Sequence, residues 1–274
     1  LSNFSLADGM AVYDMLVKAR KQFVLNEELH MVYIVTPLNH NLNPKSWGDV
    51  LERYLSLKGG ARKAADLLGI SEQWLDHASR NPPKQGVTSP ALSLHKRFFA
   101  ALLLWDLVRE VPINDVAKRY EIQRGSLQYL QQQACSFAGM VSNFCEGLNW
   151  WDMRLLTSHF RDRVLSGVQG DLLELVKVPG VNASRARALY KAGFRNHAMI
   201  AAAKQKDVEA ALRKSLPPAL LAARGGAGAA GRKGQRRGNK GAETRAAKLI
   251  IAKARQLLAE EAVDRQHEAQ ELLE

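Results

Sequence analysis

Cysteine is nearly absent from this 274-residue sequence, which contains only Cys135 and Cys145. The surrounding pattern predicts one helix through both. A rise of about 1.5 Å per residue then separates them by about 15 Å, which is too far for a disulfide bond. This usage is typical of a reducing compartment. Since 46% of the residues are apolar, the chain can form a real core without cross-links.

Long hydrophobic runs are also missing. The longest apolar block, Phe98 to Trp105, is far shorter than the ~18 residues that span a bilayer, so we expect no membrane partner of the kind that a spanning helix enters. The first residues, LSNFSLADG, have neither the basic start nor the apolar core of a signal peptide. Because the sequence begins with Leu1, we interpret it as a piece of a longer protein.

Motifs for catalysis are absent as well. The glycine run at 225–234 lacks the Lys-Ser/Thr ending of a nucleotide-binding loop and follows no predicted strand. The seven histidines are scattered and form no ligand set with the two cysteines, so no metal site is predicted. No paired carboxylates or nucleophile elbow are found. We therefore expect no catalytic residue and no cofactor in this chain by itself.

Positive charge, in contrast, is abundant. Lys and Arg outnumber Asp and Glu by 39 to 27, which gives a net charge of +12 and a pI near 9.8. Such an excess favours a polyanionic partner, either nucleic acid or an anionic membrane surface. A charge that serves only solubility is the alternative.

Almost every segment has the pattern of a helix, so the predicted fold class is all-α. Residues 93–110 form a strongly apolar helix. Residues 224–241, RGGAGAAGRKGQRRGNKG, have the composition of a flexible basic linker, and a last helix is predicted from about Glu243.

The stretch from Gln123 to Trp150 is predicted to be a long helix with two different faces. Apolar residues recur at three- and four-residue steps and mark the inner face: Leu127, Leu130, Ala134, Phe137, Val141, Phe144 and Leu148. The opposite face is neutral and polar: Gln128, Gln132, Ser136, Gly139 and Asn143. Solvated helix faces usually carry Lys and Glu, so this face either packs inside the protein or contacts a ligand.

Residues 172–194, LLELVKVPGVNASRARALYKAGF, contain two helical patterns around a Pro-Gly-Val-Asn turn. This arrangement resembles a DNA-binding helix-hairpin-helix, whose turn directs backbone N–H groups at a phosphate oxygen. Asn182 stands where a second glycine is usual, and Asn accommodates the left-handed conformation better than most residues. The predicted contacts are Gly180, Val181, Asn182, Ser184, Arg185, Arg187 and Lys191. A hairpin that only packs against protein is the alternative.

Four blocks in this order resemble one known family: ELHMVYIVTP, HKRFFAALLLWDLVREVP, RGSLQYLQQQACSFAGM and VKVPGVNASRARALYKAGF. They are similar to the C-terminal part of the helicase region of DNA polymerase theta and, less closely, to the HELQ-type superfamily 2 DNA helicases. The resemblance covers nearly the whole chain.

The resemblance implies a domain order. Residues 1–7 would be the tail of a winged-helix domain, 8–168 a multi-helix ratchet domain, and 169–216 a helix-hairpin-helix domain. Residues 217–241 would be the basic linker and 242–274 a C-terminal helix. The parent would be an ATP-dependent 3′-to-5′ DNA helicase of DNA repair in the nucleus, with or without a polymerase domain. ATP and Mg²⁺ would bind to RecA-like domains outside this chain, and those domains and the winged helix would be its intramolecular partners.

In that family the helix at 123–150 would be the ratchet helix, which lies along single-stranded or partly duplex DNA. In archaeal relatives an Arg and a Trp on this helix contact DNA, and the matching positions are Tyr129 and Ser136. Tyr129 can stack on a base, whereas Ser136 cannot. The DNA contacts expected on this helix are Arg124, Gln128, Tyr129, Gln132 and Ser136. Two alternatives remain: accessory domains of an RNA helicase, and a helical scaffold for protein interactions.

Overall fold

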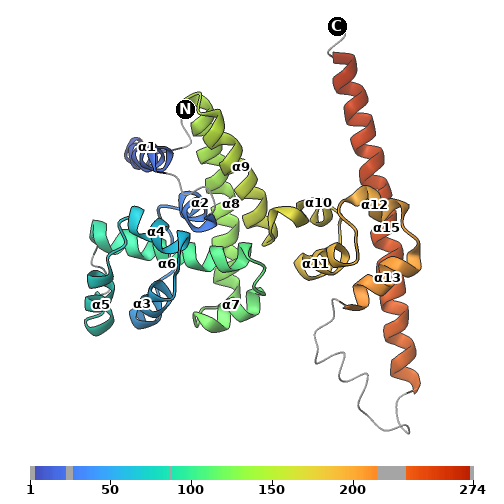
Figure 1. Cartoon of the computed structure of the whole chain (residues 1–274), viewed down its shortest axis with the longest axis horizontal. Helices are drawn as coiled ribbons and strands as arrows, with labels where there is room; N and C mark the ends of the chain where they lie inside the picture. Colours follow the sequence, from blue (N-terminus) through green and yellow to red (C-terminus); the bar gives the residue numbers. More distant parts are fainter. Residues whose placement is uncertain (1–3, 23–26, 85, 87, 215–232, 272–274) are drawn as a thin grey trace. The chain divides into compact units, whose positions relative to one another are not determined.

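The computed structural model of the chain describes residues 4–22, 27–84, 86, 88–214 and 233–271. The regular structure in these ranges is helical, without a β-strand, so the predicted all-α class is confirmed. The chain divides into two compact units, residues 1–168 and 169–274, which are called unit 1 and unit 2 below (Figure 1). In the described ranges no helix has both the length and the hydropathy needed to cross a bilayer.

Unit 1 is a bundle of helices joined by short connections. Serine hydroxyls cap four of them and accept a backbone N–H that the helix itself leaves without a partner. The helices are α1 (Leu6–Lys21), α2 (Glu28–Val35), α3 (Trp47–Leu55), α4 (Gly60–Leu67), α5 (Glu72–Arg80), α6 (Pro90–Val108), α7 (Ile113–Arg119), α8 (Arg124–Gly147) and α9 (Trp151–Ser166).

The core of unit 1 forms around α6. Every residue from Arg97 to Val108 is buried, which confirms the strongly apolar helix predicted there. Phe98, Leu102 and Leu103 are among the largest side chains that are completely buried. Two charged residues, Arg97 and Asp106, lie within this buried stretch, and each therefore needs polar partners.

Arg97 is 6% exposed and lies at the C-terminal end of α2, where the last carbonyl groups have no partner inside the helix. Its Nη2 donates to the carbonyl oxygens of Thr36 at 2.7 Å and Ile34 at 3.3 Å, and its Nε donates to that of Thr36 at 3.0 Å. The guanidinium also lies 4.5 Å from the ring centroid of Tyr33. Burial lowers the pKa of Arg97, while a cation at a helix C-terminus is stabilised by the helix dipole. Arg97 thus joins α6 to the segment that follows α2.

Asp106 is 2% exposed and joins three helices. It accepts hydrogen bonds from Arg53 Nη2 of α3 at 2.7 Å and from Arg119 Nη1 of α7 at 2.7 Å. The hydroxyl of Tyr120, directly after α7, donates to the same carboxylate at 3.0 Å. Two arginines and a phenol thus satisfy one buried carboxylate.

The pair of helices α8 and α9 closes the other side of the core. Gln131 Nε2 of α8 donates to the carbonyl oxygen of Val164 in α9 at 2.7 Å. Arg163 Nη2 of α9 donates to Glu28 Oε1 of α2 at 2.5 Å. The bond from Gln131 holds α8 against α9, and the pair of Arg163 with Glu28 holds α9 against α2.

Unit 2 contains η1 (Gly170–Leu172), α10 (Leu173–Val176), α11 (Ala183–Lys191), α12 (His197–Ala202), α13 (Gln205–Lys214) and the long α15 (Lys233–Glu271). Its core is small and aliphatic, with Val181, Leu189 and Ile250 all buried. Arg255 Nε of α15 donates to the carbonyl oxygen of Ala201 in α12 at 2.9 Å, which ties the long helix to the shorter ones.

Two predicted boundaries differ from the structure. The C-terminal helix begins at Lys233, so residues 233–241 of the predicted linker are helical. Lys, Arg and Gln in this stretch are good helix formers, whereas its three glycines are not, so the helix there is an extension of the packed part of α15. Residues 217–232 of that linker lie outside the described residues. At the other end, α1 begins at Leu6, so the predicted domain boundary after residue 7 falls inside a helix.

Candidate nucleic-acid interface

α8 exposes the neutral face that the sequence indicated and buries the apolar one. Leu127, Leu130, Ala134, Phe137 and Val141 are buried, as predicted, whereas Phe144 and Leu148 of the same predicted face are half-buried. Gln128, Tyr129, Gln132 and Ser136 are exposed, and the side chain of Tyr129 is 58% exposed. Gly139, predicted on the same face, is half-buried beside Arg161 of α9, so packing explains that position but not the exposed Gln128, Gln132 and Ser136.

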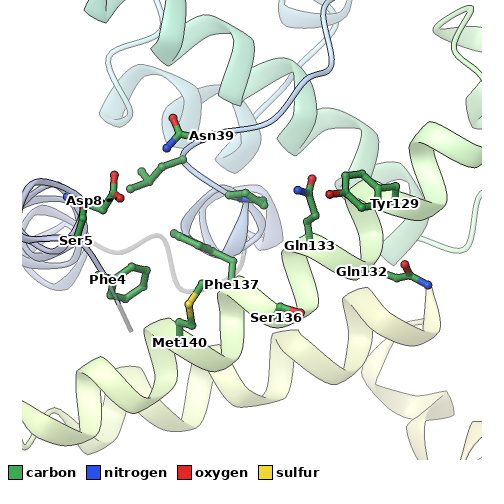
Figure 2. A pocket seen from close by; sticks show the side chains of 12 residues that line it. Phe4, Ser5, Asp8, Asn39, Tyr129, Gln132, Gln133, Ser136, Phe137 and Met140 are labelled. Carbon is green, nitrogen blue, oxygen red and sulfur yellow. Dashed lines mark hydrogen bonds between the residues drawn. The ribbon is translucent and has the colours of Figure 1, made fainter. Parts of the chain in front are cut away.

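A hollow of about 450 Å³ lies along part of this face. Figure 2 shows that its walls come from three segments: the start of α1, the loop after α2, and α8. Tyr129, Gln132 and Ser136 of α8 lie on one side, and Leu38 and Asn39 of the loop lie on the other.

Apolar side chains form part of the lining. The rings of Phe4 and Phe137 pack edge to face with 5.6 Å between their centroids, and Met140 lies beside them. The polar lining consists of amides and hydroxyls, with Asp8 as its only carboxylate among the described residues. Such a surface offers stacking and hydrogen bonds but little charge.

The five predicted contacts of α8 are all accessible but do not form one cluster. Tyr129, Gln132 and Ser136 line the hollow, whereas Arg124 and Gln128 are exposed but do not line it. Ser136 presents a hydroxyl and no ring, as expected.

The hairpin of unit 2 has the predicted turn. Gly180 has φ +93°, a conformation that side chains rarely adopt, so glycine is required there. Val181 is 5% exposed and fills the hairpin core, and its N–H donates to the carbonyl oxygen of Val178 at 3.0 Å. The turn residues Gly180, Asn182 and Ser184 are exposed.

Asn182 has a different role from the one predicted. Its φ is −89°, so it is extended rather than left-handed. Its Oδ1 accepts the N–H of Arg185 at 3.0 Å, which makes it the N-cap of α11. Asn is one of the preferred N-cap residues, and this explains its presence better than tolerance of a left-handed turn. The cap also occupies one backbone donor that we expected to be available for phosphate.

The basic side chains of the hairpin are not equally available. Arg185 Nη1 donates to the carbonyl oxygen of Gly180 at 2.6 Å and so braces the turn. Arg187 forms an ion pair with Asp171, at 2.9 Å and 3.2 Å from its two carboxylate oxygens. Lys191 is exposed at the last turn of α11. Of these three, Lys191 is best placed to meet a phosphate.

Sequence reasoning missed the opposite wall of the hollow. Leu38 and Asn39 form it, and Gln133 lines the hollow from α8, although none of the three was predicted as a site residue. The repeated Asn in LNHNLNP at 38–44 was the available signal. Its proximity to α8 depends on tertiary packing, which the sequence pattern does not reveal.

Comparison with known proteins gives a consistent result. Residues 7–164 match the family model described as the helical domain of the DNA polymerase Q helicase-like region. DNA polymerase theta of Drosophila melanogaster is 37% identical over 217 residues, which cover 78% of this chain and 10% of that protein. Helicase POLQ-like of Homo sapiens is 29% identical over 189 residues, which cover 68% of this chain and 17% of that protein.

A more distant similarity reaches the archaea. ATP-dependent DNA helicase Hel308 of Thermococcus kodakarensis is 35% identical over 112 residues, which cover 39% of this chain and 10% of that protein. The chain spans about a tenth of the length of the DNA polymerase theta proteins that it matches.

Proposed function

We propose that this chain is the part of an ATP-dependent superfamily 2 helicase that holds DNA. The premise is that the chain belongs to the family of the helical domain in the helicase-like region of DNA polymerase theta. The parent enzyme would move 3′ to 5′ along one strand during DNA repair. In this proposal α8 is the ratchet helix, and the strand passes along its exposed face.

One observation carries the proposal: the exposed face of α8 is neutral and borders a hollow. A strand in that hollow could stack a base on Tyr129 and bond to the amide of Gln132. Carboxamides both donate and accept hydrogen bonds, so they suit any base edge. Weak neutral contacts can also be released at each step, as translocation requires.

The domain roles belong to the same proposal. Residues 8–168 would be the ratchet domain, 169–216 the helix-hairpin-helix domain, and 1–7 the end of a winged helix. ATP and Mg²⁺ would be bound by RecA-like domains outside this chain, which by itself would not hydrolyse ATP. We also propose that the parent acts in the nucleus.

Replacing Tyr129 with alanine is expected to weaken binding to a fluorescent oligo(dT) strand by about tenfold or more, because stacking on an aromatic side chain contributes ~1–3 kcal/mol per base. Fluorescence anisotropy with the full chain measures this. Tyr129→Phe keeps the ring and should bind within about twofold of the original chain. Since the side chain is 58% exposed, the melting temperature should not change in either variant.

Failure of the full chain to bind oligo(dT) at low salt would contradict the proposed function. Tighter binding to oligo(U) than to oligo(dT) would assign the chain to RNA. Equal losses in the Ala and Phe variants would show that the hydroxyl acts rather than the ring.

Lys191→Gln tests the hairpin. A lysine that contacts a phosphate releases a counterion on binding, so its loss should reduce the slope of log K against log salt by about 0.7 for a single strand. The loss of affinity should be the same for different base sequences. Lys63→Gln, an equal charge change at an exposed position of α4, is the control and should leave the slope unchanged. An unchanged slope in Lys191→Gln would show that Lys191 does not contact a phosphate.

A further inference from the structure

The segment between α2 and α3 alternates in exposure. Asn39, Asn41 and Asn43 are exposed, while the residues between them, His40 and Leu42, are half-buried. Alternation with a period of two is the geometry of an extended chain, in which successive side chains point to opposite sides. The segment therefore presents a row of carboxamides to solvent.

A second hollow of about 310 Å³ lies against this row. Asn39, Asn41 and Lys96 line it, together with Ser93 and Gln133. Asn39 and Gln133 also line the hollow beside Tyr129, so the two hollows adjoin along the edge of α8.

The lining of the second hollow contains no carboxylate among the described residues. Lys96 has no acidic partner in the part of the chain that the structure describes, so its charge is available to an anion. Burial, together with the charges of Arg97 and Lys96, lowers the pKa of His40 to about 4, so its imidazole is neutral at pH 7. The hollow thus combines one cation with neutral hydrogen-bonding groups.

We propose that Asn39 and Asn41 hold unpaired bases of the same nucleic-acid strand that lies on α8, and that Lys96 holds one of its phosphates. This inference rests on the proposed function and extends the path across the loop. Asparagine bonds to base edges through both its donor and its acceptor, and unpaired bases leave those edges accessible. Lys96 supplies the positive charge that attracts a backbone phosphate.

Hydrogen bonds to buried residues hold the start of this loop in place. Arg97, directly after Lys96, donates to the carbonyl oxygen of Thr36 at 2.7 Å, three residues before Asn39. Thr36 Oγ1 in turn donates to the carbonyl oxygen of Val32 at 2.7 Å. The start of the row is therefore anchored to the core, and little ordering is needed when a strand binds.

The test uses the full chain and a fluorescent oligo(dT) strand. The double variant Asn39→Ala/Asn41→Ala should bind about tenfold more weakly, because two side-chain hydrogen bonds are lost. Asn43→Ala is the matched control: it lies on the same exposed row but lines neither hollow, and it should bind within about twofold of the original chain. Lys96→Gln should reduce the salt slope by about 0.7.

The outcomes separate the two proposals. If the chain does not bind oligo(dT), the proposed function fails, and this inference fails with it. If Tyr129→Ala weakens binding while the double asparagine variant does not, the inference is overturned and the proposed function stands. Equal weakening in Asn43→Ala also overturns it, because the loss would then come from the loop as a whole. All these asparagines are exposed, so unchanged melting temperatures verify that each variant is folded.

Discussion

Replacement of Arg97 by methionine is expected to lower the free energy of unfolding of the chain by about 3 kcal/mol, because buried carbonyl groups would lose a charged donor. Arg97 provides three hydrogen bonds to the carbonyl oxygens of Ile34 and Thr36. Methionine fills a similar volume but donates nothing. The expected cost therefore comes from unsatisfied acceptors at the end of α2 rather than from a cavity.

Urea denaturation followed by circular dichroism measures this change. Arg161→Met is the control, since Arg161 is exposed on α9 and its ion pair is with its neighbour Asp162. Its effect should stay within about 0.5 kcal/mol. A similar small effect for Arg97→Met would show that water or side-chain rearrangement satisfies the carbonyl groups.

Asp106→Asn is expected to destabilise the chain by about 3 kcal/mol, because it removes a buried charge that two arginines share. Asn has nearly the same shape, yet one of its two ends would be an NH₂ group. That group would face a donor of either Arg53 or Arg119, and two donors cannot bond to each other. The partial exposure of both arginines limits the effect, since their charges can be partly solvated.

The same denaturation experiment with Asp162→Asn is the comparison, because Asp162 forms an exposed pair at 3.2 Å. We expect a change below about 0.5 kcal/mol there. If both substitutions had equal effects, the buried carboxylate would have no special role in joining α3, α6 and α7.

The local sequence pattern was sufficient to predict much of the fold. The spacing from Leu127 to Val141 identified both the length and the buried face of α8, because side chains three and four residues apart share one side of a helix. The turn at Gly180 was also predictable, since few residues other than glycine adopt a positive φ. The family resemblance from ordered sequence blocks agrees with the match to residues 7–164.

What the sequence did not reveal depends on contacts between distant residues. Arg187, which was predicted to contact a phosphate, forms an ion pair with Asp171. The packing of residues 37–39 beside α8 creates one wall of the hollow. Asn182 was misinterpreted because capping and left-handed turns favour the same residue type. In each case the sequence showed the type of residue but not which other residue it contacts.

The ion pair between Glu28 and Arg163 has a consequence for biosynthesis. Its two residues are 135 positions apart, so ribosomes adding ~5–20 residues per second make them about 7–27 s apart. During that interval α2 has left the ribosome without α9, although all its residues from Leu29 to Val35 are buried in the finished protein. Until α8 and α9 have been made, α2 can pack only against helices that precede them, such as α4 and α6, which also contact it in the native structure. Unit 1 therefore reaches its native packing only when its last helix is available.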